Sequence, residues 1–161
     1  FRKPLVVFTP KKLLRYPRAV SSISEMSTGS FQEVIDDLNA IASKTNKVVF
    51  CSGKFYYDLI EEYEKNSIDD IAFIRLEQLY PYPENQLKSV VKKYGKNSQY
   101  IWAQEEPENM GPWSYILRKW KLSNIICFSR NESGSPASGS PKVHEIRHQE
   151  IINKVMSYSK K

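Results

Sequence analysis

The chain has 161 residues, of which 40% are hydrophobic and 12% aromatic, and its formal net charge is +6. This composition excludes an intrinsically disordered chain, in which few apolar residues and a high net charge prevent a core from forming. A chain of this length buries roughly 70% of its unfolded surface, so it needs neither a metal nor a disulfide to fold. No apolar run approaches the ~20 residues of a membrane helix. We therefore expect one compact domain over residues 1–161 and no membrane partner.

The excess positive charge lies in residues 1–18, which hold six Lys and Arg residues and no acid, while the rest of the chain is balanced. Basic residues interleaved with Phe1, Phe8 and Tyr16 could contact phosphates and stack on bases. The apolar residues at 5–8 and 13–14 instead favour a strand followed by a short helix, each with a basic solvent face. We therefore expect no nucleic-acid partner.

Five apolar runs rich in Val, Ile, Phe and Trp predict buried strands, at residues 5–8, 47–51, 70–76, 99–103 and 124–128. Apolar residues at helical spacing predict helices at 56–65, 84–94, 113–120 and 143–156. Continuous apolar runs are typical of strands covered on both faces. Strands that alternate with helices predict right-handed crossovers and a largely parallel sheet in a three-layer α/β sandwich.

The breaks between these elements have local causes. Gly95 is expected to end the helix that precedes it, because glycine lacks the Cβ that opposes a left-handed cap. The stretch 131–141 is a loop by composition, since it contains four serines, two prolines and two glycines. A loop of this composition is usually a flexible surface connection.

The cysteines and histidines give no convincing chemical site. Cys51 and Cys127 each lie inside a strand-like run, which favours two small buried apolar residues over a disulfide or a reactive pair. Residues 144–148 read H-E-x-x-H and formally match the zinc-protease pattern. Their neighbours, Lys142 and Arg147 among them, are polar, and the chain has no third histidine to complete a zinc site. We therefore interpret the match as accidental and expect no metal ligands.

The acidic string at residues 104–113 (Q-E-E-P-E-N-M-G-P-W) follows a predicted strand and precedes a predicted helix. In open α/β sheets, functional residues collect beyond the carboxyl ends of parallel strands. Adjacent carboxylates there could be catalytic, could bind basic groups of a partner, or could complement the dipole of the following helix. The string alone leaves these three roles open.

Several motifs together resemble one family, in order and in spacing. They are R-K-P-L-V-V-F-T-P-K-K-L-L-R at 2–15, A-V-S-S at 19–22, C-S-G-K at 51–54 with Y-Y-D-L at 56–59, R-L-E-Q-L-Y-P at 75–81, and Q-E-E-P at 104–107 with N-M-G at 109–111 and Trp113. Over essentially the whole chain, they resemble the C-terminal domain of the thiamin-diphosphate-dependent first component of 2-oxoglutarate dehydrogenase.

This resemblance implies a fold like the C-terminal domain of transketolase, a three-layer α/β/α sandwich on a mixed, mainly parallel five-stranded sheet with one antiparallel strand. The complete enzyme decarboxylates 2-oxoglutarate on thiamin diphosphate and Mg2+ and passes the succinyl group to the lipoyl group of the succinyltransferase component, in the citric acid cycle. In that family, earlier domains supply the cofactor, metal and catalytic residues. We therefore expect no catalytic and no cofactor-binding residue here, and an isolated chain that is inactive and binds no thiamin diphosphate.

The resemblance implies a structural and dimerisation role, with three kinds of partner: other domains of the same enzyme, the second subunit of a homodimer, and the succinyltransferase component. The compartment would be the bacterial cytoplasm, or the mitochondrial matrix in a eukaryote. The candidate interface residues are Gln104, Glu105, Glu106, Asn109, Gly111, Trp113, Arg130, Ser135 and His144.

Three comparisons with the family refine these expectations. Asn85 and Gln86 stand where actinobacterial members carry the paired arginines of an acetyl-CoA activator site, so we expect no such activation. Many relatives have Glu-Gln where this chain has Arg147 and His148, which supports an accidental H-E-x-x-H match. Arg130 and the Ser-Pro pair at 135–136 match the loop of the family, which favours an ordered loop.

The chain begins at Phe1, in the middle of a motif and without an initiator Met, which suggests a fragment of a longer multidomain enzyme. A stand-alone protein-binding module that kept the fold without the catalytic domains is the alternative. The presence or absence of the metal-binding G-D-G motif in the adjoining reading frame would separate the two.

Overall fold

The computed structural model describes residues 2–66 and 68–159, and the chain divides into two compact units, Phe1–Phe31 and Gln32–Lys161. The first unit holds a 3-10 helix, η1 (Lys11–Arg15), and a one-turn helix, α1 (Ile23–Ser27), neither of which has a buried residue. A capping box starts α1, in which the Ser22 hydroxyl accepts from the Glu25 amide and the Glu25 carboxylate accepts from the Ser22 amide. The short helix expected after residue 8 is thus present as η1.

The strand expected at residues 5–8 is wrong. These residues have no regular secondary structure, and their side chains are 69–96% exposed. Pro4 and Pro10 flank the run and cannot donate to a sheet, and the described part of this unit holds no partner strand. An apolar run without a neighbouring strand gains nothing from extended pairing, so it stays irregular.

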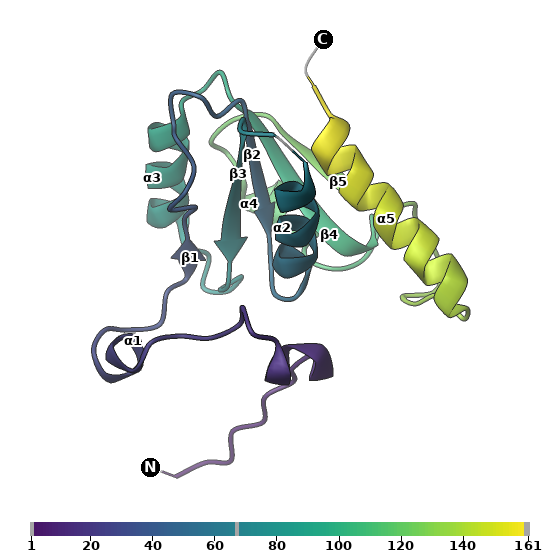
Figure 1. Ribbon diagram of the computed structural model, residues 1–161, viewed down its shortest axis with the longest axis horizontal. Coiled ribbons are helices and arrows are strands. Elements are labelled where there is room, and N and C mark those ends of the chain that lie inside the picture. Colours follow the sequence, from purple (N-terminus) through teal and green to yellow (C-terminus); the bar gives the residue numbers. More distant parts are fainter. Residues whose placement is uncertain (1, 67, 160–161) are drawn as a thin grey trace. The chain divides into compact units, whose positions relative to one another are not determined.

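The second unit is built on a five-stranded sheet in the order β1-β3-β2-β4-β5 (Figure 1). The strands are β1 (Val34–Ile35), β2 (Lys47–Cys51), β3 (Ile71–Leu76), β4 (Gln99–Pro107) and β5 (Ile125–Arg130). β1 pairs antiparallel with β3, and all other pairs are parallel. The expectation of a mixed, mainly parallel sheet with one antiparallel strand is confirmed, although β1 takes the place given to residues 5–8.

Helices cover both faces of this sheet, which confirms the three-layer sandwich. They are α2 (Phe55–Lys65), α3 (Glu84–Tyr94), α4 (Trp113–Lys119) and α5 (Pro141–Ser157). Side chains of β2 alternate between two cores: Val48 and Phe50 pack with α3 and α4, whereas Val49 and Cys51 pack with α2 and α5. The central strands of the sheet therefore carry apolar side chains on both faces, as their continuous apolar runs in the sequence predict.

The strand order places a topological switch point in the middle of the sheet. From β2 the chain moves to β3 on one side, then crosses to β4 on the other side and continues outward to β5. A crevice opens beyond the carboxyl ends of the strands where the direction of winding reverses, and ligand sites of open α/β folds lie there. In this chain that place is next to the ends of β2 and β4.

Helix α5 is anchored at the opposite, amino end of the sheet by Lys47. This lysine is buried, and its Nζ donates to the carbonyl of Met156 in the last turn of α5 at 3.0 Å. Burial lowers the pKa of Lys47, although the charge of Asp70, 3.9 Å away, opposes this shift. A cation at this point also complements the negative end of the helix dipole.

The two cysteines are free thiols, Cys51 buried and Cys127 half-buried. Burial raises the pKa of Cys127 to about 11, although a hydrogen bond with Ser129 opposes the shift, and burial also raises the pKa of Cys51. Both thiols are therefore neutral near pH 7 and weakly nucleophilic. They behave as small apolar residues of the strands, as the sequence predicts.

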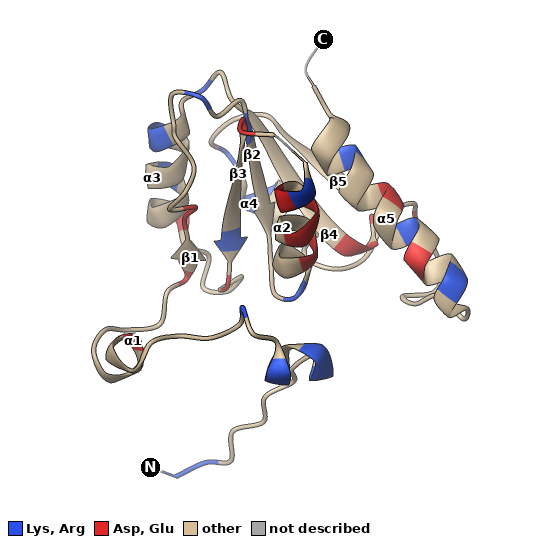
Figure 2. Ribbon diagram, in the orientation of Figure 1, with Lys and Arg blue, Asp and Glu red and all other residues tan. Residues whose placement is uncertain are grey.

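The charged side chains are distributed unevenly over the two units (Figure 2). Basic residues mark η1, whereas acidic residues mark α2 and the end of β4. Among the described helices, none combines the length and the apolar character that crossing a membrane would require.

Candidate functional site

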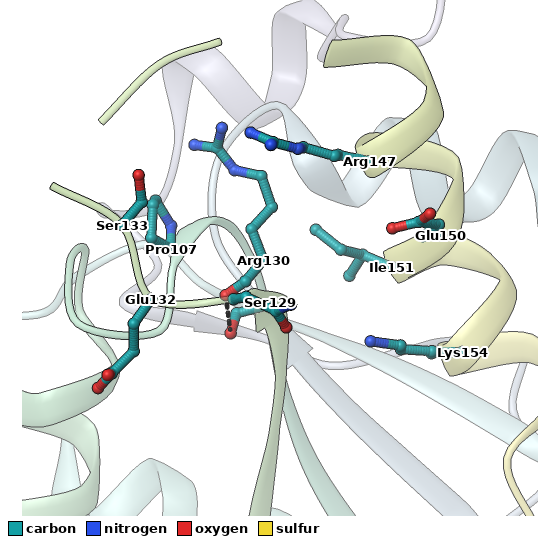
Figure 3. A pocket seen from close by; sticks show the side chains of 10 residues that line it. Pro107, Ser129, Arg130, Glu132, Ser133, Arg147, Glu150, Ile151 and Lys154 are labelled. Carbon is teal, nitrogen blue, oxygen red and sulfur yellow. Dashed lines mark hydrogen bonds between the residues drawn. The ribbon is translucent and has the colours of Figure 1, made fainter. Parts of the chain in front are cut away.

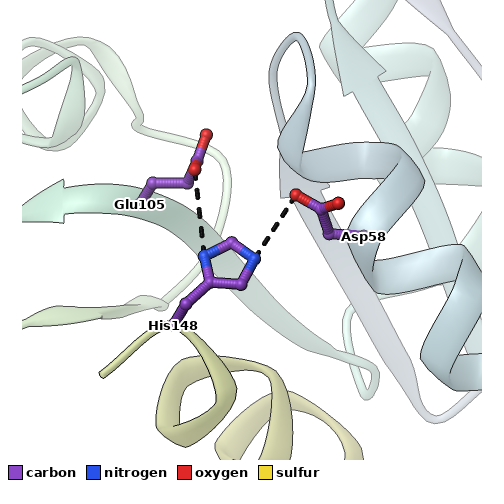
Figure 4. A group of neighbouring side chains, drawn as sticks. All are labelled: Asp58, Glu105 and His148. Carbon is purple, nitrogen blue, oxygen red and sulfur yellow. Dashed lines mark ion pairs between the residues drawn. The ribbon is translucent and has the colours of Figure 1, made fainter. Parts of the chain in front are cut away.

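Four charged side chains meet beyond the carboxyl ends of β2 and β4, at the switch point. Lys54 Nζ lies 2.8 Å from Asp58 Oδ2 and 2.6 Å from Glu105 Oε1. The His148 ring lies between the same two carboxylates, with Nε2 3.3 Å from Asp58 and Nδ1 3.8 Å from Glu105 (Figure 4). We call Lys54, Asp58, Glu105 and His148 the charge cluster. It joins α2, β4 and α5.

Local structure brings the lysine and the first carboxylate together. Gly53 has a φ of +58°, a conformation that glycine adopts without strain, and it turns the chain from β2 into α2. Lys54 then occupies the N-cap position of α2, without a capping hydrogen bond from its side chain, and Asp58 follows four residues later on the same side of the helix. Burial disfavours the Lys54 ammonium, but its hydrogen bonds and charge contacts with Asp58 and Glu105 outweigh that effect and raise its pKa.

The charge cluster has the donors of a metal site, because one ligand atom each of Asp58, Glu105 and His148 lie within 4.8 Å of one another. The Lys54 ammonium already contacts both carboxylates, so a cation of the protein compensates them. The arrangement is therefore an ion network that ties three elements together. Such networks resist separation of their members, since a lone half-buried charge is unfavourable.

The H-E-x-x-H residues do not form a catalytic zinc arrangement within the described structure. The rings of His144 and His148 stack at 5.6 Å between centroids, so the two histidines share one face of α5. His144 and Glu145 are exposed, whereas His148 turns toward the charge cluster. The glutamate thus lacks the enclosed position next to the histidines that a general base of a zinc protease requires.

Gln104 organises the turn that follows the charge cluster. Its side chain is only 3% exposed. Its Oε1 accepts from Trp102 Nε1 at 2.8 Å and from the Trp113 amide at 3.1 Å. Its Nε2 donates to the carbonyls of Pro107 at 3.1 Å and Met110 at 2.8 Å. One amide therefore fixes the end of β4, the turn and the first residue of α4.

The same turn needs a glycine at position 111. Gly111 has a φ of +65°, and a Cβ there would lie 3.0 Å from the Cβ of Glu106. Gly111→Ala is expected to lower the free energy of unfolding by about 1–2 kcal/mol, through backbone strain and the contact with Glu106. Urea denaturation measures the loss. Gly134→Ala is the matched control, because a Cβ at that position meets no atom within 4 Å. Equal losses of unfolding free energy in both variants would contradict backbone strain at position 111.

The Ser-rich loop after β5 is bonded to this turn, as the family loop led us to expect. Asn109 and Ser133 form a reciprocal pair, in which the Asn109 amide donates to the Ser133 carbonyl at 3.0 Å and accepts from its backbone N–H at 3.1 Å. Arg130 donates through Nε to the Glu105 carbonyl at 2.7 Å and through Nη2 to the Pro136 carbonyl at 2.6 Å. The Ser135 hydroxyl donates to a carbonyl two residues on, at 3.0 Å.

The structure brings the nine residues singled out from the sequence to one region, around the ends of β4 and β5. Gln104 and Trp113 are buried, whereas Glu106, Ser135 and His144 are exposed. Sequence reasoning missed Lys54 and Asp58 of the charge cluster, and it considered His148 only as part of the H-E-x-x-H pattern. Two signals could have found the first two: Gly53 at the carboxyl end of a predicted strand, and the four-residue spacing of Lys54 and Asp58.

Comparison with known proteins places this chain in a family. The family model described as 2-oxoglutarate dehydrogenase C-terminal matches residues 20–156. The oxoglutarate dehydrogenase of Buchnera aphidicola is 40% identical over 98% of this chain and 18% of its own length. The 2-oxoglutarate dehydrogenase E1 component of Rickettsia conorii is 42% identical over 94% of this chain and 17% of its own length. A mouse protein, the 2-oxoadipate dehydrogenase complex component E1, is 40% identical over 98% of this chain and 18% of its own length.

The chain thus spans less than a fifth of the curated relatives that it matches. The match nevertheless covers the sheet, the charge cluster and the Gln104 turn, because the family model extends from residue 20 to residue 156. The chain belongs to the 2-oxoglutarate dehydrogenase C-terminal family.

Proposed function

We propose that this chain serves as the C-terminal domain of a 2-oxoglutarate dehydrogenase E1 component, a part of a longer multidomain enzyme. That enzyme oxidatively decarboxylates 2-oxoglutarate and transfers succinyl to the lipoyl group of the succinyltransferase component. The observation that carries the proposal is the 38–42% identity to E1 components over 93–98% of this chain, which corresponds to only 16–17% of the relatives' own length. The bacterial cytoplasm, or the mitochondrial matrix in a eukaryote, is the corresponding compartment.

The residues of the charge cluster do not fit thiamin diphosphate with Mg2+. A diphosphate placed there would face the carboxylates of Asp58 and Glu105, and Lys54 already contacts both of them. We therefore assign no catalytic, cofactor or metal residue to this chain and derive no step of the reaction from it. In the proposal, other domains of the full-length enzyme bind thiamin diphosphate and Mg2+.

The role that we propose for the chain is structural, in support of the other domains and of a homodimer. Large apolar side chains of the Phe1–Phe31 unit are 65–96% exposed, from Leu5 to Phe31. We take this set of exposed large apolar side chains as a protein interaction site. More than four-fifths of each relative lies outside the matched region. We expect the Phe1–Phe31 unit to pack against that additional part of the enzyme.

The residues around the Gln104 turn have two parts in this role. Gln104 and Trp113 are buried and hold the shape of the turn from inside, and Gly111 supplies its positive φ, whereas Glu106 and His144 are exposed and available to a partner. The exposed set, with Ser135, is our proposed contact with neighbouring domains, the second subunit or the succinyltransferase component. The buried set acts only through the position of the turn.

A domain exchange tests the proposal. The matching C-terminal part of the Haemophilus influenzae 2-oxoglutarate dehydrogenase E1 component is replaced by this chain. We expect the chimera to form dimers and to decarboxylate 2-oxoglutarate, whereas the truncated enzyme and the chain alone do neither. Size-exclusion chromatography with light scattering and a decarboxylation assay give the two readouts.

Variants of the chimera test the exposed segment. Val6→Asp with Phe8→Asp should reduce dimer and activity together, because charges are placed in the surface that is to be covered. Leu38→Asp is the control, since Leu38 is 95% exposed but lies outside the Phe1–Phe31 unit. A folded chimera that is as inactive as the truncated enzyme would overturn the proposal and favour a stand-alone protein-binding module.

A further inference from the structure

A cavity of about 180 Å3 lies between the carboxyl ends of β4 and β5 and one side of α5 (Figure 3). Arg130 and Ser133 line it from the strand end and the loop, and Arg147, Ile151 and Lys154 line it from α5. It is separate from the charge cluster, none of whose members lines it. Its place beyond the carboxyl ends of parallel strands is one where ligands of α/β folds bind.

The cavity collects three cations that lack an acidic partner. Among residues 2–66 and 68–159, no carboxylate forms an ion pair with Arg130, Arg147 or Lys154. The guanidinium of Arg130 donates to two backbone carbonyls, which are neutral, so its charge is not compensated. Figure 3 shows the guanidinium groups of Arg130 and Arg147 near each other at the cavity. Like charges repel, so an anion between them is favourable.

Two acidic residues, Glu132 and Glu150, also line the cavity and leave it with one net positive charge. The carboxylate of Glu132 points away from the two guanidinium groups (Figure 3). Glu150 lies on α5 between Arg147 and Lys154, so a ligand in the cavity meets cations and one carboxylate together. Such a mixture suits an anion that accepts several hydrogen bonds and also donates one.

The walls of the cavity are held in place by the rest of the fold. Arg130 is fixed by the carbonyls of Glu105 and Pro136, and Ser133 by its reciprocal pair with Asn109. Ile151 forms a floor that is 1% exposed. A site whose groups are already positioned loses little conformational freedom when a ligand binds.

We propose that this cavity binds inorganic hydrogen phosphate. Guanidinium groups match the oxygens of a phosphate in charge and in geometry. Lys154 supplies a third cation, and the phosphate O–H has an acceptor in the carboxylate of Glu150. Sulfate has the same shape and charge but carries no proton near pH 7, so Glu150 disfavours it.

Calorimetric titration of the full 161-residue chain with inorganic phosphate at pH 7 and low salt tests the site. We expect saturable binding, which Arg147→Gln with Lys154→Gln weakens about a hundredfold through the loss of two charge-assisted contacts. Lys142→Gln removes one positive charge from an exposed position of α5 that does not line the cavity, and should leave the affinity unchanged. All the substituted side chains are exposed, and circular dichroism verifies that each variant is folded.

Sulfate and glycerol 3-phosphate, a phosphomonoester, are titrated in parallel. Wild type should prefer phosphate to both, and Glu150→Gln should reduce the preference over sulfate. Absence of saturable phosphate binding, or equal weakening by Lys142→Gln, would overturn the site. Equal affinity of the wild-type chain for sulfate would overturn the assignment of hydrogen phosphate, and tighter binding of glycerol 3-phosphate would replace it by a phosphomonoester. No turnover is measured, so these outcomes do not depend on the proposed enzyme.

Discussion

Gln104→Leu is expected to lower the free energy of unfolding by at least about 3 kcal/mol. Leucine has a similar size but offers no hydrogen bond, so Trp102 Nε1 and the Trp113 amide lose their acceptor. The carbonyl of Met110 loses its donor at the same time, whereas the carbonyl of Pro107 still accepts from the Met110 backbone N–H. Unpartnered polar groups at a buried position each cost about 1–3 kcal/mol, and three such groups are left together here.

Urea denaturation followed by tryptophan fluorescence measures this loss, because Trp102 and Trp113 both form hydrogen bonds with Gln104. Gln86→Leu is the matched control, since Gln86 is exposed on α3 and its replacement should change stability by less than about 0.5 kcal/mol. A Gln104→Leu variant as stable as the Gln86→Leu variant would show that the turn does not depend on this amide.

Lys54→Met should destabilise the fold by about 2 kcal/mol at pH 7. The substitution keeps an unbranched chain of similar length but removes the cation that contacts Asp58 and Glu105. These side chains are only 11% and 27% exposed, so water compensates their charges incompletely. Lys88→Met removes an ion pair of the same spacing whose members are more than half exposed, and should cost less than about 0.5 kcal/mol.

The difference between wild type and Lys54→Met should depend on pH in a defined direction. The carboxylates of Asp58 and Glu105 raise the pKa of Lys54 above its ordinary value of 10.5, against the effect of burial. A group whose pKa is higher in the folded chain stabilises it fully below the unfolded pKa, and this contribution disappears as the pH rises through the folded pKa. Denaturation at pH 7, 9 and 11 should therefore give the same difference at pH 7 and 9 and a smaller one at pH 11. A difference that grows at pH 11 would contradict the assignment.

The central part of the fold follows from the sequence because burial on both faces leaves a simple pattern. The run at 47–51 coincides with β2, and the helix expected at 84–94 coincides with α3. For α3, the boundaries are set by local chemistry: Pro83 precedes it, and Gly95, with a φ of +80°, ends it.

Residues 5–8 show the limit of that pattern. An apolar run predicts burial, but it does not say whether the covering surface belongs to the same chain. Strand β1 is missed because its two residues, Val34 and Ile35, are too few to show a periodic pattern. They form a strand only by pairing with Leu76 and Arg75 of β3.

The charge cluster could not be predicted from the sequence, because its members come from distant positions of the chain. Asp58 and His148 meet only when α5 returns across the sheet to the side of α2. The H-E-x-x-H pattern drew attention to His148 for the wrong chemistry, since its partners are the carboxylates of α2 and β4 and not a second histidine with a metal. The family motifs located the Gln104 turn, but only the structure shows that Gln104 points inward.

The two contacts of α5 have a mechanical consequence. His148 is held by the charge cluster at the carboxyl end of the sheet, and the carbonyl of Met156 is held by Lys47 at the amino end, about 12 Å further along the helix axis. A slide of α5 by one turn, as in helix ratchets of some allosteric proteins, would break both contacts at once. The helix therefore behaves as a strut of fixed register, so a displacement of α5 at one end of the sheet also strains its contact at the other end.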